Sequence, residues 1–370
     1  MPIDVRVSRA VRQDAVTFTC GQCDLDRDGR PRNAGDLAAQ TAQALRHLQD
    51  VLAEAGAAPA DLAHLHVFYR NDGGVAEPTY RAAVADILGS GVHPAAMFTP
   101  IPAFFYPGVE VEIDAVAVSQ AGGDVIRATA GGAVVTRAGD LLFAVSEGDD
   151  GQADAASRMG AVLDDLAAAL DAVEAGMADL GKLTLYLSDS IPVATRPAVE
   201  AALAARFPAP GPVRTTVWLP RLGAAIRLEA MGVADPAGRG AERQSLVLDT
   251  LLADGPFSHG LCCGDILFIG AMRALDAAGA VTAPGDLAAQ THAAMETLSS
   301  VLAAFGCGFE HLVKVNTYYA SSGAAEELHT NLAIRSGYYV APGPASTGIP
   351  VPHLALDGAL ISVDAVAMRG

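Results

Sequence analysis

The sequence has few basic residues. Its 370 residues include 24 lysines and arginines against 42 aspartates and glutamates, a formal net charge of −18. This balance argues against nucleic-acid partners and against anionic membrane surfaces. Charged residues make up only 18% of the chain and hydrophobic residues 51%, a composition typical of a compact globular protein rather than a disordered one. We therefore expect no nucleic-acid partner and no membrane partner.

The sequence also lacks an obvious membrane-spanning segment. The uncharged stretch 93–109 contains four prolines, which interrupt a helix, and no secretory-type hydrophobic segment follows Met1. Five cysteines, an odd number, are typical of reduced thiols, so we expect a cytoplasmic protein. The motifs of phosphate-binding loops, dinucleotide-binding folds, zinc peptidases and α/β hydrolases are missing, and we expect no cofactor.

What the sequence does contain is a phrase that occurs twice. The seven residues Gly-Asp-Leu-Ala-Ala-Gln-Thr stand at 35–41 and again, unchanged, at 285–291. The copies are 250 residues apart, close to two repeats of about 125, which predicts a diverged third copy between them. The chain would then consist of three similar units.

Other segments locate the middle copy. Three sets of segments align, and the first two sets share both offsets: 61–69, 179–186 and 311–319; 93–96, 211–214 and 343–346; 112–117, 229–234 and 362–367. We therefore predict unit one at 1–119, unit two at 120–237 and unit three at 238–370. Glycine-rich segments around both boundaries support this division.

Each unit repeats one order of elements. Short strands come first, followed by a helix, a β-branched or aromatic strand, a second helix and two closing strands. Apolar residues fall at three- and four-residue steps between 37 and 55, and unit three repeats this pattern between 287 and 305. The pattern predicts an α+β fold in which each unit is one sheet with helices on one face.

These residues resemble the Rid (YjgF/YER057c/UK114) family. Segments 255–260 and 264–270 are similar to the family's GPYSQ…GDxxxxSGQ motif, and 19–22 is similar to its SGQ turn. The repeated phrase looks like the start of the family's first helix, and 212–217 looks like the PARSTV strand that carries its arginine. The resemblance covers nearly the whole chain in three copies and is weakest in the first half of unit two.

The resemblance implies a fold and an assembly. Members of the family are homotrimers of chorismate-mutase-like α+β subunits, with their sites in the three clefts between subunits. Three such units in one chain imply an intramolecular pseudo-trimer, whose linked units bury their apolar sheet faces at high effective concentration. We expect the chain to be a monomeric pseudo-trimer or a dimer of it.

The resemblance also implies a chemistry. In the family an arginine binds the substrate carboxylate, and a glutamate fifteen residues later places or activates water. Unit two has both, as Arg214 and Glu229. At the arginine position, unit one has Ala96 and unit three has Ser346. A guanidinium binds a carboxylate bidentately and a carboxylate in a dry cleft can steer water, so we predict Arg214 and Glu229 to be catalytic.

Neighbouring residues are predicted to complete the cleft. Thr216 lies two positions after Arg214, on the same strand face. The resemblance implies further substrate-binding residues in the other units: Phe257, Asn331, Cys20 and Gly21. In the units without the arginine, unit one keeps a carboxylate at Glu112 and unit three has Ser346 in place of the arginine, and these residues mark a secondary cleft of weaker or different use.

Two further groupings favour structural roles. Cys20 and Cys23 form a C-x-x-C motif, but the motif ends a strand and enters a turn rather than opening a helix, which disfavours a thioredoxin-like redox role. His64 and His66 share one strand face, but no third ligand is spaced to join them, so we expect no metal site.

Three functions remain open at this point. The first is a cofactor-free hydrolase or deaminase that converts 2-imino or enamine acids to a keto acid and ammonia. The second is a specialised hydrolase or lyase of secondary metabolism that acts on a cyclic unsaturated acid, because the chorismatases, a related branch, use Rid-like units in this way. The third is a non-catalytic binder of small carboxylates. All three imply a small carboxylate-bearing partner.

Overall fold

The computed structural model of the chain describes residues 5–119, 124–148, 154–223, 226–235, 242–252, 255–321 and 324–369. The predicted boundaries near residues 120 and 238 fall outside these ranges, so they stay predictions. The names unit one, unit two and unit three are kept below for the three parts of the chain.

The strands form three sheets, one centred on each unit. Their orders are β1-β2-β5-β3-β4, β13-β10-β9-β11-β8-β7-β6 and β12-β14-β15-β18-β16-β17. Unit one contributes β1 (Ala10–Gln13), β2 (Val16–Thr19), β3 (Leu62–Arg70), β4 (Ala95–Ile101) and β5 (Val111–Val118). Unit two contributes β6 (Val125–Ala130), β7 (Ala133–Ala138), β8 (Leu141–Glu147), β9 (Leu180–Ser188), β10 (Gly211–Leu219) and β11 (Ile226–Val233). Unit three contributes β12 (Arg243–Leu246), β13 (Phe257–Ser258), β14 (Gly260–Cys263), β15 (Ile266–Met272), β16 (Leu312–Ala320), β17 (Ala345–Val351) and β18 (Ile361–Met368).

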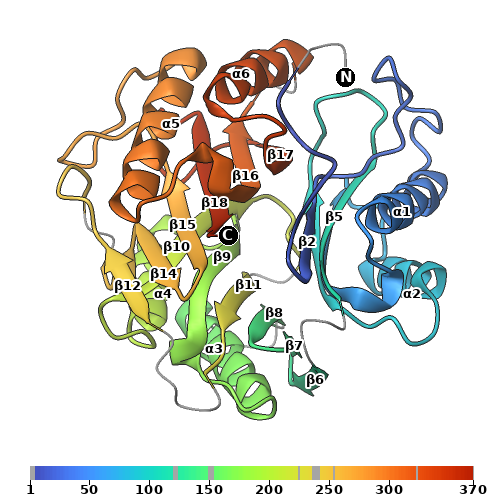
Figure 1. Cartoon of the computed structure of the whole chain (residues 1–370), viewed down its shortest axis with the longest axis horizontal. Coiled ribbons are helices and arrows are strands. Elements are labelled where there is room, and N and C mark those ends of the chain that lie inside the picture. Colours follow the sequence, from blue (N-terminus) through green and yellow to red (C-terminus); the bar gives the residue numbers. More distant parts are fainter. Residues whose placement is uncertain are drawn as a thin grey trace.

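Each unit carries a pair of α-helices on the outside of the molecule (Figure 1). The pairs are α1 (Leu37–Glu54) with α2 (Glu77–Leu88), α3 (Ala155–Asp171) with α4 (Arg196–Ala204), and α5 (Leu287–Ala304) with α6 (Ala325–Tyr338). The order of elements and the helices on one face of each sheet confirm the predicted α+β fold of tandem Rid-like units.

The core has four parts. Within each unit the helices pack against one face of the sheet through a separate cluster of buried apolar side chains. A fourth cluster joins the opposite faces of all three sheets and includes Phe18, Tyr186 and Phe268. Burial of apolar area is the main favourable term in folding, so this shared cluster holds the units against one another.

The structure explains why one phrase is preserved twice. Asp36 and Asp286 are N-caps, and each accepts a hydrogen bond of 2.9 Å from the backbone N–H three residues later. The next polar residue, Gln40, donates to the Gly108 carbonyl at 2.6 Å, and Gln290 makes the equivalent bond to Gly358 at 2.8 Å. The phrase therefore starts a helix and fastens the loop that precedes the last strand of its unit.

Unit three also contributes to the sheet of unit two. The short strand β13 runs parallel to β10, with Phe257 opposite Gly211 and Ser258 opposite Val213. Ser258 donates from Oγ to the Gly211 carbonyl at 2.8 Å. The arginine strand of unit two is thus covered at its edge by the unit that follows it in the chain.

Candidate functional site

A cavity lies between units one and three, and we call it the one–three cavity. It measures about 360 Å³ and is lined by the loop after β2, residues 104–109 and β5 of unit one, and by α6 and β17 of unit three. Its polar side chains include Cys20, Glu112, Arg335 and Ser346. The sequence predicted Glu112 and Ser346 to mark a secondary cleft, and the structure brings both to this one cavity.

Glu112 is the acidic group of the one–three cavity. It projects from β5 over Gly21, where an added Cβ atom would lie 1.8 Å from its Oε1 atom, so a glycine leaves room for the carboxyl group. Burial, and then the nearby Asp114 carboxylate, raise the pKa of Glu112 to about 8, although Lys314 acts in the opposite direction. Glu112 is therefore a neutral carboxylic acid at pH 7 and can donate a proton.

Arg335 is the buried basic group of the same cavity. It is 1% exposed, and its guanidinium donates to Asn331 Oδ1 at 2.7 Å, Tyr319 Oη at 2.6 Å and Tyr339 Oη at 3.1 Å. A longer bond of 3.3 Å reaches Ser346 Oγ. All four partners are neutral, and no carboxylate in the described part of the chain pairs with this guanidinium. A buried cation of this kind is costly unless an anion compensates it, which favours an anionic ligand.

Asn331 supports Arg335 rather than the cleft in which the sequence placed it. Its Oδ1 atom accepts from Arg335, and its Nδ2 donates to Thr291 Oγ1 at 2.7 Å. Thr291 is the last residue of the repeated phrase and donates in turn to the Leu287 carbonyl at 2.6 Å. Asn331 is fully buried, so it orients the guanidinium and does not line the cavity.

Cys20 and Gly21 line the one–three cavity, not the Arg214 cleft that they were predicted to complete, and the neighbouring Cys23 lines it too. Burial raises the pKa of the Cys20 thiol to about 11 and also raises that of Cys23. A thiol protonated at neutral pH is a poor nucleophile, which disfavours a redox role for this C-x-x-C motif.

The remaining walls are mostly apolar or aromatic. Phe104, Phe105 and Tyr106 come from the loop that Gln40 fastens, and Phe105 meets Tyr319 edge-on with ring centroids 5.4 Å apart. Tyr106 Oη forms a 2.8 Å hydrogen bond with His329 Nε2 of α6, across the two units. The site thus combines the acid Glu112, the buried cation Arg335 and, at Arg9, a second arginine paired with Glu54, with a wide apolar surface.

Arg214 lies in a different cleft, between units two and three. Its guanidinium pairs with Glu200 of α4 and lies 4.5 Å from the centroid of the Phe257 ring. The cavity beside it measures only about 40 Å³. The structure therefore brings Arg214 and Phe257 together, as predicted, but Thr216 and Glu229 do not line this cavity.

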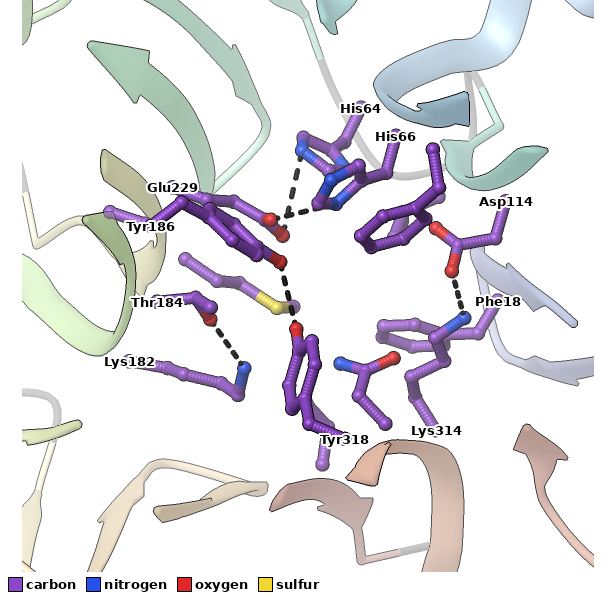
Figure 2. Close-up of a pocket in the computed structure, with 16 residues that line it drawn as sticks. Phe18, His64, His66, Asp114, Lys182, Thr184, Tyr186, Glu229, Lys314 and Tyr318 are labelled. Carbon is purple, nitrogen blue, oxygen red and sulfur yellow. Dashed lines mark hydrogen bonds and ion pairs between the residues drawn. The ribbon is translucent and has the colours of Figure 1, made fainter. Parts of the chain in front are cut away.

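Glu229 instead lies in a small central pocket of about 50 Å³, where strands of all three sheets meet. Figure 2 shows its carboxylate beside two imidazoles, with Oε2 2.9 Å from His66 Nδ1 and Oε1 3.6 Å from His64 Nε2. Burial alone would raise the pKa of Glu229, but the two histidines outweigh it and hold this pKa well below its usual range. Burial lowers the pKa of His64.

The strand register corrects the alignment that paired Arg214 with Glu229. Glu229 lies opposite Thr184, as Asp114 lies opposite His66 and Asp364 opposite Asn316. The structural counterpart of Glu112 in unit two is Arg227, which lies opposite Tyr186 as Glu112 lies opposite Phe68. The sequence alignment was therefore shifted by two residues. It matched Glu112 of unit one to Glu229 of unit two, and because alternate residues of a strand face the same side, a shift of two keeps the pattern of buried and exposed residues.

The cleft between units one and two is filled by charged side chains. Arg227 is 2% exposed and donates to Glu77 of α2 at 2.8 and 2.9 Å. Arg81 donates to Glu77 at 2.7 Å and to Glu147 of β8 at 2.6 Å. Tyr69 donates to Glu77 at 2.5 Å. The bonds from Arg227 to Glu77 and from Arg81 to Glu147 link the two units directly.

In the ranges given above, no group of three or more His, Cys, Asp or Glu side chains is placed to hold a metal ion. Across the same residues, no helix is long and apolar enough to span a membrane.

Comparisons with known proteins agree with the fold. A family model described as Endoribonuclease L-PSP matches residues 4–119 and 248–369. The 2-iminobutanoate/2-iminopropanoate deaminase of Mus musculus is 26% identical over 117 residues, which cover 30% of this chain and 87% of that protein. Protein DfrA of Myxococcus xanthus is 29% identical over 118 residues, covering 31% of this chain and 87% of that protein.

A solved structure is similar over nearly the full length. A chorismatase crystal structure has a TM-score of 0.56 and 14% identity, and the similarity covers 95% of this chain and 99% of that one. At this identity the likeness concerns the fold alone. The chain belongs to the Endoribonuclease L-PSP family, and the predicted resemblance to Rid proteins is confirmed.

Sequence reasoning missed Arg335. It placed no cation in the one–three cavity, because Ser346 occupies the strand position of the family's arginine. One signal was available, since Arg335 follows Asn331 by four residues and therefore shares its helix face. In the structure the helix supplies the guanidinium that the strand lacks.

Proposed function

We propose that this chain is a cofactor-free hydrolase that acts on an unsaturated carboxylic acid in the one–three cavity. One observation carries the proposal: a carboxyl group with a pKa near neutrality, Glu112, and a buried guanidinium without a carboxylate partner among the described residues, Arg335, line the same cavity. This choice replaces the Arg214 cleft of the sequence-based hypothesis.

Arg335 binds the substrate carboxylate in this proposal. A guanidinium has five N–H donors, and Asn331, Tyr319, Tyr339 and Ser346 engage four of those of Arg335. The long bond to Ser346 is the weakest of these and can be exchanged for a carboxylate oxygen. The two tyrosines and Asn331 keep the guanidinium plane fixed, so the carboxylate binds in one orientation.

Glu112 serves as the general acid. Its proton passes to the double bond next to the substrate carboxylate, to the terminal carbon of an enol ether or to the nitrogen of an imine. Water then adds to the cationic carbon, and the Glu112 carboxylate takes up the proton that this water releases. The adduct breaks into a keto acid and either an alcohol or ammonia.

The size and lining of the cavity favour a substrate with a ring. A cavity of about 360 Å³ with three aromatic side chains on one wall is larger and more apolar than a four-carbon imino acid requires. We therefore place an enol ether of a keto acid with a cyclic alcohol first, which corresponds to the second of the functions left open by the sequence.

Imine hydrolysis is the second candidate. The similarity to the mouse 2-iminobutanoate/2-iminopropanoate deaminase favours it, although that similarity covers one unit only. The same acid and the same guanidinium would serve this reaction, so the two candidates differ in the part of the substrate that lies against the apolar wall.

Two assays separate the candidates. The first supplies 2-phenoxyprop-2-enoate and measures phenol and pyruvate; the second supplies 2-iminobutanoate, generated by an amino-acid oxidase, and measures loss of the imine with release of ammonia. We expect turnover in the first assay to exceed that in the second. Turnover of the imine alone would replace the first candidate by the second.

Substitutions then identify the cleft. In the assay that shows turnover, R335M should reduce kcat/KM roughly a hundredfold, because a charge-assisted carboxylate contact is lost. The matched control is R206M, which removes an exposed arginine from the pair with Asp164. If R214M abolishes turnover while R335M leaves it intact, the one–three cavity is not the active site.

A further inference from the structure

Lys314 crosses from unit three into unit one behind the one–three cavity. It projects from β16, and its side chain is 8% exposed. Its ammonium donates to the Thr19 carbonyl, to Asp114 Oδ2 and to Thr347 Oγ1, each at 2.8 Å. Figure 2 shows the bond to Asp114 at the edge of the central pocket. The three bonds use all three donors of the ammonium group.

Each partner of Lys314 is a close neighbour, along its own strand or loop, of a residue that lines the cavity. Thr19 precedes Cys20, and Thr347 follows Ser346. Asp114 lies two residues after Glu112, on the same face of β5. One side chain therefore ties together the loop after β2, β5 and β17, which are three separate walls of the cavity.

We propose that Lys314 is a positioning residue that fixes these three walls relative to one another and sets the local charge at Glu112. Its catalytic consequence rests on the function proposed above, whereas its effect on Glu112 does not. Thr347 Oγ1 also donates a hydrogen bond of 2.5 Å to Asp114 Oδ2, which connects β17 directly to β5.

The charges around Glu112 support this role. The groups that line the cavity with Glu112 or interact with it come from every element packed there: Cys20, Cys23, Asp114, Lys314, Tyr106, Arg9 and Arg335. Burial raises the pKa of Glu112, Asp114 raises it further, and Lys314 lowers it. Loss of the ammonium would leave the Asp114 carboxylate unpaired beside Glu112 and disfavour a second negative charge.

Unit two offers a matched comparison. Lys182 occupies the equivalent position on β9 and forms an ion pair of 3.0 Å with Asp364 Oδ1 and a 3.1 Å bond to Thr184 Oγ1. Like Lys314, it lines the central pocket and not the one–three cavity. Its partners Asp364 and Thr184 are not beside residues of that cavity, whereas Lys314 bonds to Thr19, Asp114 and Thr347. A role that depends on the cavity walls therefore belongs to Lys314 and not to Lys182.

The test compares K314M with K182M. NMR of protein with ¹³C-labelled glutamate follows the titration of Glu112 directly, and E112Q identifies its signal. We expect the Glu112 midpoint to move to higher pH in K314M and to stay at its wild-type value in K182M. In the assay that shows turnover, K314M should reduce kcat/KM roughly tenfold at pH 7, with KM raised, because the walls move apart.

A second variant guards against a failure to fold. T347V keeps the ammonium but removes one of its three bonds, and we expect a raised KM with an unchanged Glu112 midpoint. If K314M does not fold, K314Q, which keeps a hydrogen-bond donor, takes its place.

Equal Glu112 midpoints in wild type and in the lysine variant would overturn the charge role, and an unchanged KM in both the lysine variant and T347V would overturn the positioning role. A shifted midpoint in a protein that turns over neither substrate would contradict the proposed function alone.

Discussion

The one–three and one–two clefts are built from equivalent strands, yet they hold opposite arrangements of charge. In the first, Glu112 on β5 and Arg335 on α6 line a cavity. In the second, the position equivalent to Glu112 is Arg227, which is bonded to Glu77 within the protein. Buried charges that compensate one another join two units, whereas an acid and a cation kept apart around a cavity are available to a ligand.

The two–three cleft adds a second contrast. It retains Arg214 at the strand position of the family's arginine, but this arginine pairs with Glu200 beside a cavity of about 40 Å³. The one–three cleft has Ser346 at that position and a cavity of about 360 Å³. A retained motif residue therefore does not identify the open cleft.

The largest expected effect concerns the acid of the one–three cleft. E112Q keeps the shape of the side chain but removes the transferable proton, so kcat should fall roughly a thousandfold. The measurement is steady-state turnover of the substrate identified above, with circular dichroism as a check of folding. Turnover within tenfold of wild type would show that Glu112 is not the general acid.

The next effect concerns the filled cleft between units one and two. E77Q weakens a buried network that includes Arg227 and Arg81, and should lower the free energy of unfolding by roughly 3 kcal/mol without a comparable change in turnover. D164N, which breaks an exposed pair with Arg206, should cost less than about 1 kcal/mol. Denaturant titration of both variants measures the difference, and equal losses would refute the structural role of this cleft.

A pH profile sharpens the comparison further. Burial raises the pKa of Glu112 to about 8, so its carboxyl group is protonated below that pH and ionised above it. As a general acid it is active only when protonated, so kcat/KM should be level below pH 8 and fall about tenfold per pH unit above it. In C20S, kcat/KM should begin to fall at the same pH, because the pKa of the Cys20 thiol is about 11. If the fall begins at a different pH in C20S, the group that titrates is the thiol.

The smallest expected effect concerns the support of Arg335. N331A removes the acceptor of the 2.7 Å bond from Arg335 Nε, and should raise KM roughly fivefold with kcat nearly unchanged. Y80F in unit one removes the 2.8 Å bond to Thr41, the counterpart of Thr291, and should leave KM unchanged. If N331A and Y80F have equal KM values, Asn331 does not contribute to substrate binding.

The fold could be predicted from the sequence because the patterns that determine it are local and occur in more than one unit. The phrase at 35–41 and 285–291, the helical periodicity and the segments that align in three copies depend on capping, loop fastening and alternation along a strand, which act over short distances. The sequence was also sufficient to name Cys20, Gly21, Glu112 and Ser346, and the structure brings all four to one cavity.

The rest of the site depended on contacts between units. Arg335 and Ser346 lie on different elements, and no periodicity indicates that a helix supplies the cation that a strand has lost. Glu229 was aligned with Glu112 because both are glutamates near the start of a closing strand. Only the pairing of Glu229 with Thr184 and of Arg227 with Tyr186 reveals the two-residue shift.

The short strand β13 makes unit two dependent on unit three. Because Phe257 and Ser258 of unit three cover the edge of β10, a chain that ended after residue 235 would leave this edge of unit two open to pairing with other molecules. Unit two alone would therefore need another way to protect this edge from aggregation.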